Sequence, residues 1–307
     1  GRNPARIVAS DLGFAVGPRL NAAGRLDDMS IGIECLLADT DQAYQLAQQL
    51  DSLNRERRDI ESDMKLEALD YLEHFQLTAD SIYGLAMYDE NWHQGVIGIL
   101  ASRIKDRLHR PVIIFAPGDE GEIKGSARSI KGIHIRDVLE AISTSEPGLI
   151  KKFGGHAMAA GLTIDAVSFD RFHQLFDARV KAIANEEILE NIIYSDGELA
   201  ADEYTLETVE LIEYAGPWGQ EFPEPLFSGK FNVINQRVLK ERHYKLVVCP
   251  ENRQDLFLDG IAFNQLEGNE NPAEVNLPNK IEMVYKLSVN EFRGQQNLQL
   301  MIDQIFT

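Results

Sequence analysis

The chain has 307 residues, of which 44% are hydrophobic, and its net charge is −19 at neutral pH. This length accommodates two or three domains, no apolar run approaches the ~20 residues of a membrane span, and the start lacks the charged-then-apolar pattern of an export leader. Two distant cysteines, Cys35 and Cys249, fit neither a zinc cluster nor a disulfide framework. We therefore expect two buried free thiols in a reducing cytoplasm.

Residues 1–38 mix short apolar runs with turn residues and form the start of a predicted connection over residues 1–78. Arg19 and Arg25 are separated by Asn21 and small residues, which would let the backbone lie close to a nucleic-acid strand. The spacing of six residues between Arg19 and Arg25 places them on different faces of a helix, so they need not bind the same ligand. A salt bridge to Asp27 or Asp28 is the structural alternative.

Residues 40–76 are predicted to form one long helix. They contain no proline or glycine, offer N-cap candidates at residues 39–41, and repeat apolar residues about every 3.5 positions. Such a helix spans roughly 55 Å, which indicates a strut that keeps its flanking domains apart. The arginines at positions 55, 57 and 58 lie among acids, which favours an ion-paired, solvated face over phosphate binding.

Residues 79–185 are predicted to fold as a compact α/β domain. The expected strands are 82–88, 112–115, 122–129 and 159–164, and the expected helices are 94–109, 133–142 and 169–184. Trp92, at a strand-to-helix junction, is more often a core residue than a base-stacking platform. Gly95 and Gly98 each weaken the following helix by roughly 1 kcal/mol relative to alanine, which indicates that another backbone comes close.

The stretch 151–161 (KKFGGHAMAAG) suggests phosphate capture. Gly154 and Gly155 leave no side chain to block a ligand, amide groups at such a turn suit an anion, and His156 is a donor that carries charge near neutral pH. The alternative is a tight turn that leads into a buried strand.

Lys124, Ser126 and Arg128 alternate along the expected strand 122–129 and therefore share one face. A hydroxyl and two cations that project together suit a phosphate. A salt bridge from Arg128 to Glu122 or Asp137 is the structural alternative.

The acidic residues are concentrated in the segment 186–225, which is predicted to be a connector with a short helix at 206–214. Residues 185–224 hold twelve acids and no Lys or Arg, whereas residues 90–160 hold ten basic and eight acidic residues. Negative charge is thus kept away from the phosphate-like motifs. It can keep nucleic acid off wrong surfaces, and ordinary solubility is an equal explanation.

Residues 226–307 have an all-β pattern, with strands expected at 231–236, 244–249, 256–263, 281–289 and 298–305. Five strands in about 80 residues indicate a small barrel of OB type. Such barrels bind single strands through aromatic platforms and basic grooves. The candidates are the aromatics Phe231, Tyr244 and Phe292, with Lys230, Arg237, Arg242 and Arg293 near them, although most of these aromatics fit a core equally well.

Several stretches taken in this order resemble RecJ-type exonucleases of the DHH phosphoesterase superfamily, which act on single-stranded DNA. They are residues 17–28 (GPRLNAAGRLDD), 92–99 (WHQGVIGI), 125–129 (GSARS), 151–161 and 218–225 (WGQEFPEP). The resemblance covers nearly the whole chain, but the Asp-His-His triplet of the family's catalytic half is absent. The sequence is therefore interpreted as the C-terminal portion of such a protein.

The resemblance implies a fold class of α/β plus all-β: a long connecting helix, a mixed-sheet DHH-associated domain and an OB-type β-barrel. It implies that Ser126, Arg128, Gly154, Gly155 and His156 grip a terminal phosphate, and that Arg19, Asn21 and Arg25 contact the backbone beside it. Two Mn²⁺ or Mg²⁺ ions would belong to the absent half of a 5′→3′ exonuclease of recombination and repair, with no metal bound by this part.

Single-stranded DNA is the expected partner, and a single-strand-binding protein and a helicase are further expected partners in the cytoplasm. Two alternatives stay open. One is a phosphoesterase for short oligoribonucleotides or cyclic dinucleotides, which would not need the barrel. The other is a non-catalytic single-strand-binding or docking module.

Overall fold

The structure is a computed structural model that describes residues 7, 9–74, 82–219, 222–266, 275–292 and 294–306. The chain divides into two compact units, Gly1–Asn191 and Ile192–Thr307. Each unit has a hydrophobic core of its own. Among the described helices, none is long and apolar enough to cross a membrane.

The first unit begins with short helices that pack beside a long one. They are α1 (Ala9–Asp11), the π-helix η2 (Leu12–Val16), α2 (Gly17–Leu26) and α3 (Ser30–Leu37). Small residues let α2 approach its neighbours closely, because Ala22 and Ala23 are fully buried.

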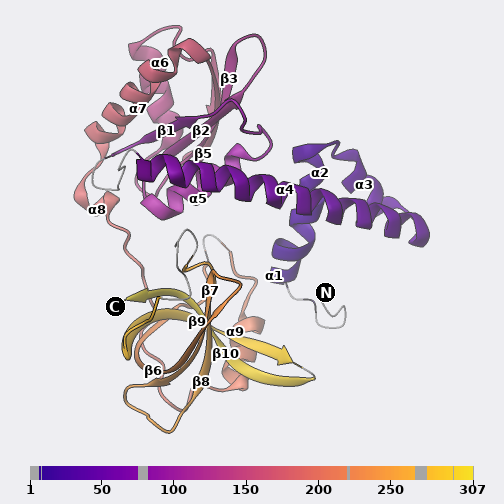
Figure 1. The fold of residues 1–307 in the computed structure, drawn as a ribbon, viewed down its shortest axis with the longest axis vertical. Helices are drawn as coiled ribbons and strands as arrows, with labels where there is room; N and C mark the ends of the chain where they lie inside the picture. Colours follow the sequence, from indigo (N-terminus) through magenta and orange to yellow (C-terminus); the bar gives the residue numbers. More distant parts are fainter. Residues whose placement is uncertain are drawn as a thin grey trace. The chain divides into compact units, whose positions relative to one another are not determined.

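The long helix α4 runs from Thr40 to His74, close to its predicted bounds, and its 35 residues span about 50 Å. Its C-terminal half buries Met64, Ala68, Leu69 and Leu72 against the α/β domain. Its N-terminal half packs against α2 and α3. Figure 1 shows α4 extending well past the sheet toward α2 and α3, so the strut prediction describes its shape.

The sheet of the first unit has five strands in the order β1-β2-β3-β5-β4. They are β1 (Leu85–Tyr88), β2 (Val112–Pro117), β3 (Glu122–Arg128), β4 (Lys152–Gly155) and β5 (Ala159–Asp165). β1 and β2 are parallel and the other pairs are antiparallel, which confirms the predicted mixed sheet.

Helices cover this sheet unevenly. The helices are α5 (Ile97–Leu108), α6 (Ile135–Ser145), the short η3 (Ala166–Ser168), α7 (Phe169–Ile183) and α8 (Glu186–Leu189). α6 and α7 pack on one face, and α5 with the end of α4 packs on the other (Figure 1). On the face that α5 covers, this helix contacts β2 and β3. The part of that face formed by β5 and β4 lies outside the area that α5 covers.

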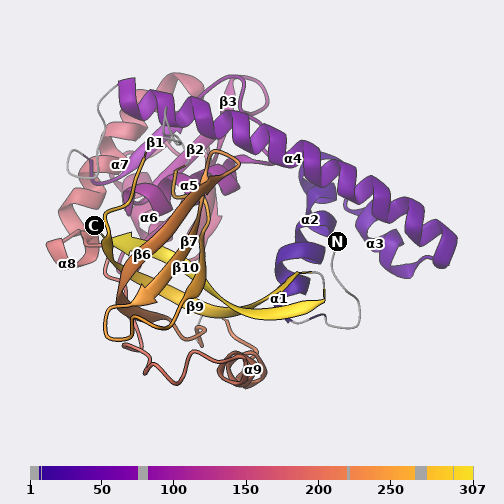
Figure 2. The same ribbon diagram turned by 60° about the horizontal axis from the view of Figure 1, so that its bottom comes forward.

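The second unit is a closed barrel with strand order β10-β8-β7-β6-β9. Its strands are β6 (Phe227–Leu239), β7 (His243–Pro250), β8 (Leu258–Ala262), β9 (Lys280–Phe292) and β10 (Gln295–Phe306). The five predicted strands and the OB-type barrel are confirmed. In Figure 2, β9 and β10 continue beyond the barrel as a two-stranded ribbon.

Helix α9 (Leu206–Ala215) is the predicted short helix of the acidic segment. Its Val209 is fully buried and belongs to the barrel core. The acidic segment from Ile192 onward is part of the second compact unit.

Three local predictions are wrong. Gly154 and Gly155 end strand β4 rather than forming a turn, because the reversal takes place in the hairpin that follows at residues 156–158. The helix expected from residue 94 begins at Ile97, since Gly95 N–H donates to His93 Nδ1 before it. Cys249 is buried as expected, but Cys35 is only half-buried.

Candidate nucleic-acid interface

Beside α5, the open part of the sheet carries two exposed glycines next to Ser126. Ser126, Gly161 and Gly154 are direct register partners across β3, β5 and β4, so they present one face. A Cβ placed on Gly154 would meet nothing within 4 Å, and one on Gly161 would meet only the Gly125 carbonyl oxygen at 3.8 Å. Both glycines are exposed, so a ligand can lie directly on the backbone.

A second row lies next to these three residues. Arg128 is the register partner of Ala159, and His156 N–H donates to the Ala159 carbonyl at 2.8 Å. Neighbouring strands lie about 4.8 Å apart, so Arg128 and His156 flank a strip roughly two strand spacings wide. We call the two rows together, residues 126, 128, 154, 156, 159 and 161, the glycine shelf.

Arg128 is the cation of the shelf. Its guanidinium donates to Ser126 Oγ at 3.1 Å and to the Ala127 carbonyl at 2.8 Å. Burial and the nearby Arg25 lower the pKa of Arg128 from its ordinary value. Among the described residues, no carboxylate lies within ion-pair distance of it, so the site favours an added anion.

The structural alternative for Arg128, a salt bridge to Glu122 or Asp137, is not formed. Glu122 accepts from Lys151 at 3.0 Å, and Asp137 lies 2.9 Å from His134 Nδ1. Lys124, on the same face as Ser126, pairs with Asp119 at 3.1 Å. The side-chain alternation along β3 is confirmed by its burial pattern.

The first turn of α5 packs on Ser126 and Arg128. A Cβ on Gly98 would lie 2.8 Å from Arg128 Nη2 and 3.0 Å from Ser126 Oγ, and one on Gly95 would collide with the Arg25 carbonyl oxygen. The predicted approach of another backbone is therefore confirmed at Gly95, whereas the close neighbours of Gly98 are side chains. The positive end of the α5 dipole adds to the field at the shelf.

The arginines of α2 have different surroundings, as their spacing predicts. Arg25 Nη1 donates to the Gly95 carbonyl at 3.1 Å, which holds Arg25 near Arg128. Arg19 instead donates to Asp51 on α4 at 2.8 Å, and its guanidinium holds the pKa of Asp51 below its usual range. Asn21 is exposed.

The alternative salt bridge from these arginines to Asp27 or Asp28 is wrong, since Arg19 pairs with Asp51 and Asp28 accepts from Ser30 N–H at 2.8 Å. On α4, Arg55 pairs with Asp51 and Arg57 with Glu61. The ion-paired interpretation of that face is confirmed for these two residues.

Gly155 is required for the geometry of the shelf. Its φ is 151°, and a Cβ there would collide with the Ala159 carbonyl oxygen and the Ala160 backbone. β4 is an edge strand of the sheet. The backbone N–H and C=O groups on its outer side therefore have no neighbouring strand among the described residues to hydrogen-bond with. His156 is exposed beside it.

Trp92 is a core residue, as favoured from the sequence. It is 5% exposed, and its Nε1 donates to Glu67 of α4 at 2.8 Å. It joins the strut to the β1–α5 junction and has no surface for base stacking.

Two of the three barrel aromatics named from the sequence are core residues and not stacking platforms. Phe231 and Tyr244 are 1% and 3% exposed and lie in the barrel core, while the side chain of Phe292 and residue Arg293 lie outside the described residues. Phe257 and Phe263 are exposed instead, and Phe263 packs edge-on to His243 at 5.1 Å. The sequence contained a signal for this, because residues 256–263 alternate between the two faces of a strand. That alternation places Phe257 and Phe263 on the face opposite to their buried neighbours.

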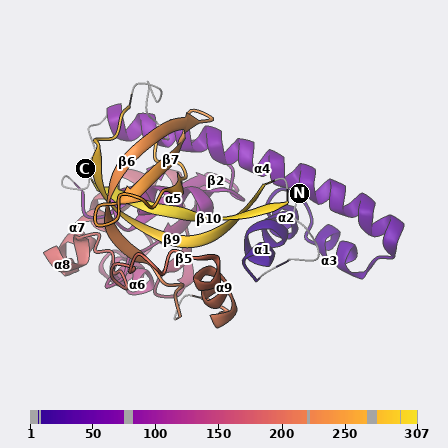
Figure 3. The ribbon, with the colours of Figure 1, turned by 90° about the horizontal axis from the view of Figure 1, so that it is seen from below.

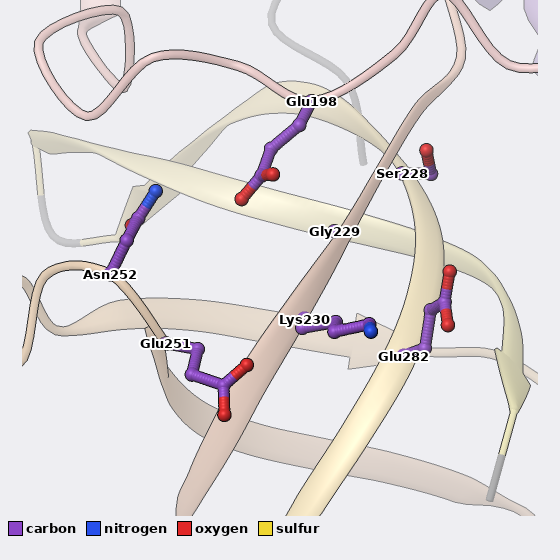
Figure 4. A pocket seen from close by; sticks show the side chains of 7 residues that line it. All are labelled: Glu198, Ser228, Gly229, Lys230, Glu251, Asn252 and Glu282. Carbon is purple, nitrogen blue, oxygen red and sulfur yellow. The ribbon is translucent and has the colours of Figure 1, made fainter.

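A cavity of about 410 Å³ on the barrel has the wrong charge for phosphate. Figure 4 shows Lys230 between Glu251 and Glu282, with Glu198 opposite. Three carboxylates and one lysine thus line the cavity, and Glu251 accepts from Lys280 at 2.6 Å beside it, so carboxylates outnumber cations in the lining.

The described residues do not fit a catalytic metal. They include no group of three or more His, Cys, Asp or Glu side chains placed to hold one. The described residues thus supply no set of ligands for the ions of a metal-assisted hydrolysis.

The fold and these surfaces define a known pair of modules. The DHHA1 domain family matches residues 81–182, and the RecJ OB domain family matches residues 195–304. Residues 81–182 are thus a DHHA1 domain, which carries the glycine shelf, and residues 195–304 are a RecJ OB domain.

The chain belongs to the RecJ family. It is 53% identical over 307 residues to the single-stranded-DNA-specific exonuclease RecJ of Dickeya dadantii (strain 3937), with 99% of this chain and 53% of that protein covered. The chain is 50% identical to the single-stranded-DNA-specific exonuclease RecJ of Escherichia coli (strain K12). That match covers 99% of this chain and 52% of that protein. The chain thus spans about half the length of these relatives.

A solved structure agrees with this assignment. The crystal structure of RecJ in complex with Mg²⁺ from Thermus thermophilus has a TM-score of 0.77 and 25% identity. The match covers 98% of this chain and 44% of that one.

Proposed function

We propose that this chain is the DNA-handling portion of a single-stranded-DNA exonuclease that acts in the 5′→3′ direction in recombination and repair. Its relatives are described as single-stranded-DNA-specific exonucleases RecJ, and this chain spans about half of them. Two structures of the Thermus thermophilus protein are described as complexes with Mg²⁺ and with Mn²⁺. Hydrolysis with two such ions belongs to the half that this chain does not span.

The glycine shelf carries the proposal. Arg128 is a half-buried cation without a carboxylate partner among the described residues, and Ser126 and His156 supply donors beside a floor of exposed glycines. This set grips the terminal phosphate, since an arginine presents parallel N–H donors to phosphate oxygens. Arg25 reinforces the positive field at the glycine shelf. Asn21 and Arg19 contact the DNA backbone next to the terminal phosphate, once Arg19 exchanges its partner Asp51 for a phosphate group.

The barrel captures the incoming strand. Its exposed Phe257 and Phe263 stack on bases, which is worth ~1–3 kcal/mol per base. A phosphoesterase for dinucleotides has no need of such a track, so a longer substrate is favoured. A single-strand-binding protein and a helicase that supply the strand are proposed partners, in the cytoplasm.

Filling the shelf floor tests the proposal. Gly161→Val and Gly154→Val place side chains in open space, and valine suits a strand, so melting temperature is expected to stay unchanged. Affinity of the chain for a 5′-phosphorylated single strand is expected to fall about tenfold or more, because a charged hydrogen bond is worth roughly 1.5–3 kcal/mol.

Thr163→Val is the matched control, since Thr163 faces Lys124 one row further along β5. It is expected to bind like the parent chain. Full affinity in both glycine variants would rule out the shelf as the binding site.

A further inference from the structure

The outward face of α9 is an unpartnered surface on the barrel. Figures 1 and 3 show α9 on the outside of the barrel, where it contacts β9 and β10. Its Val209 is buried, whereas Leu211 and Tyr214 are 68% and 85% exposed. Positions 207, 210, 211 and 214 recur at helical spacing, so Glu207 and Glu210 share the face of the two apolar side chains.

An aromatic pair lies at the C-terminal end of the helix. Trp218 Nε1 donates to the Ile212 carbonyl at 3.0 Å, which holds this pair against the last turn of α9. The Trp218 ring packs on Phe222 with centroids 4.7 Å apart, and Phe222 is 56% exposed. We call residues 207, 210, 211, 214 and 222 the α9 surface.

Charge determines what can cover the α9 surface. Residues 185–224 hold twelve acids and no Lys or Arg, and among the described residues neither Glu207 nor Glu210 has an ion-pair partner. Like charge repels nucleic acid, an anionic membrane and a second copy of this surface. A positively charged partner with apolar anchors is complementary.

We propose that the α9 surface binds a basic amphipathic helix of a partner protein. Leu211 and Tyr214 receive the apolar anchors of that helix, which recur at i, i+3, i+4 and i+7. Its Lys and Arg side chains pair with Glu207 and Glu210 at the rim. This docking function is separate from the handling of DNA and does not depend on it.

A synthetic helix tests the proposal on the full 307-residue chain. The probe is a labelled peptide of roughly five helical turns with Leu and Phe on one face and Lys and Arg on the other. A scrambled peptide of the same composition is its control. Anisotropy at about 0.15 M salt is expected to show binding of the amphipathic peptide and much weaker binding of the scrambled one.

Two double variants separate anchors from charge. Leu211→Ser/Tyr214→Ser is expected to weaken peptide binding about tenfold, as for residues at an interface centre. Glu207→Gln/Glu210→Gln is expected to weaken it and to flatten its salt dependence. The matched controls are Val167→Ser, at a residue that is 95% exposed, and Glu186→Gln/Glu187→Gln on exposed α8, which are expected to bind the peptide normally.

Three results would overturn the proposal. They are equal binding of the scrambled peptide, equal loss from the Glu186 and Glu187 changes, and unchanged binding by the Leu211 and Tyr214 variant. Self-association of the chain that this variant abolishes would identify a second copy as the occupant instead. Every substituted side chain is exposed, so the variants are expected to fold, and retained affinity for single-stranded DNA checks this.

Discussion

Arg128 is the residue on which the proposed phosphate grip depends most directly. Its guanidinium is already oriented by Ser126 and the Ala127 carbonyl, and a lysine lacks the planar fork. Arg128→Lys is therefore expected to lower the affinity of this chain for 5′-phosphorylated strands about tenfold to a hundredfold, although the charge is kept. The loss is expected to be much smaller for 5′-hydroxyl strands.

The measurement is the ratio of affinities for 5′-phosphate and 5′-hydroxyl strands, together with the melting temperature. Arg128→Ala is expected to reduce the ratio further. A lowered melting temperature with an unchanged ratio would instead assign Arg128 a purely structural role.

Most of the residues that form the glycine shelf could be predicted from the sequence, but their backbone conformations could not. Alternation placed Ser126 and Arg128 on one face correctly. The Gly154–Gly155 pair gave no sign that it ends an edge strand, because glycine suits both a turn and the φ of 151° found at Gly155. The aromatics Phe231 and Tyr244 were open to either role, since their neighbours in sequence do not reveal which way a barrel strand faces.

At the scale of elements, α4 is held to the domain by its apolar side chains, and this can be measured. Leu69 is 5% exposed and Leu66, one turn earlier, is 56% exposed. Leu69→Ala is expected to destabilise the first unit by about 2–5 kcal/mol, whereas Leu66→Ala is expected to cost well under ~1 kcal/mol.

Denaturant unfolding in a Trp218→Phe background reports on this, because Trp92 is then the remaining tryptophan and lies in the same core as Leu69. Equal effects of the two substitutions would show that α4 is not anchored through this face.

Helix α7 gives the first unit a dependence on pH. Burial lowers the pKa of His173 below its ordinary value of 6.5, although Asp177 and Asp170 oppose the shift. Below pH 6.5 the unfolded chain binds a proton that the folded one resists, so stability is expected to fall as pH falls from 6.5 toward the folded pKa.

His173→Gln is expected to reduce this decline, measured as the free energy of unfolding of the first unit between pH 7.5 and pH 5.5 (about one unit on either side of the ordinary histidine pKa). A decline of the same size in the variant would show that other groups cause it, among them His109, whose pKa burial also lowers.

The elements themselves were readable from the sequence. The bounds of α4 follow from a long run without glycine or proline, and the five barrel strands follow from β-branched and apolar patterning. Helix α3 is different, since Leu36 and Leu37 are 70% and 80% exposed. Apolar periodicity marks which face of a helix is apolar but not whether this chain covers it.

For the whole molecule, the chain is expected to hydrolyse no DNA with Mn²⁺ or Mg²⁺. Its described residues offer no cluster of metal ligands, and a two-metal site needs carboxylates or histidines that converge on both ions. The measurement is nucleotide release from an end-labelled single strand. Release by clean protein that EDTA abolishes would contradict this expectation.

The chain is also expected to bind long single strands through both units at once. Linking two modest sites raises overall affinity by roughly 10²–10⁴ when one ligand spans both, and an OB barrel occupies ~4–16 nucleotides. A 5′-phosphorylated strand of about 30 nucleotides is therefore expected to bind far more tightly than one of about 4. Its affinity is expected to decrease with salt at a slope of about −0.7 per phosphate contact.

Variants of each unit distinguish joint binding from independent binding. Phe257→Ser/Phe263→Ser is expected to reduce the affinity for the long strand toward that for the short one, while binding of the short 5′-phosphorylated strand at the shelf stays unchanged. Gly161→Val is expected to weaken both, because it acts on the end of the strand. If the barrel variant bound the long strand as tightly as the parent chain, the exposed aromatics would have no part in capturing the strand, and the shelf would act alone.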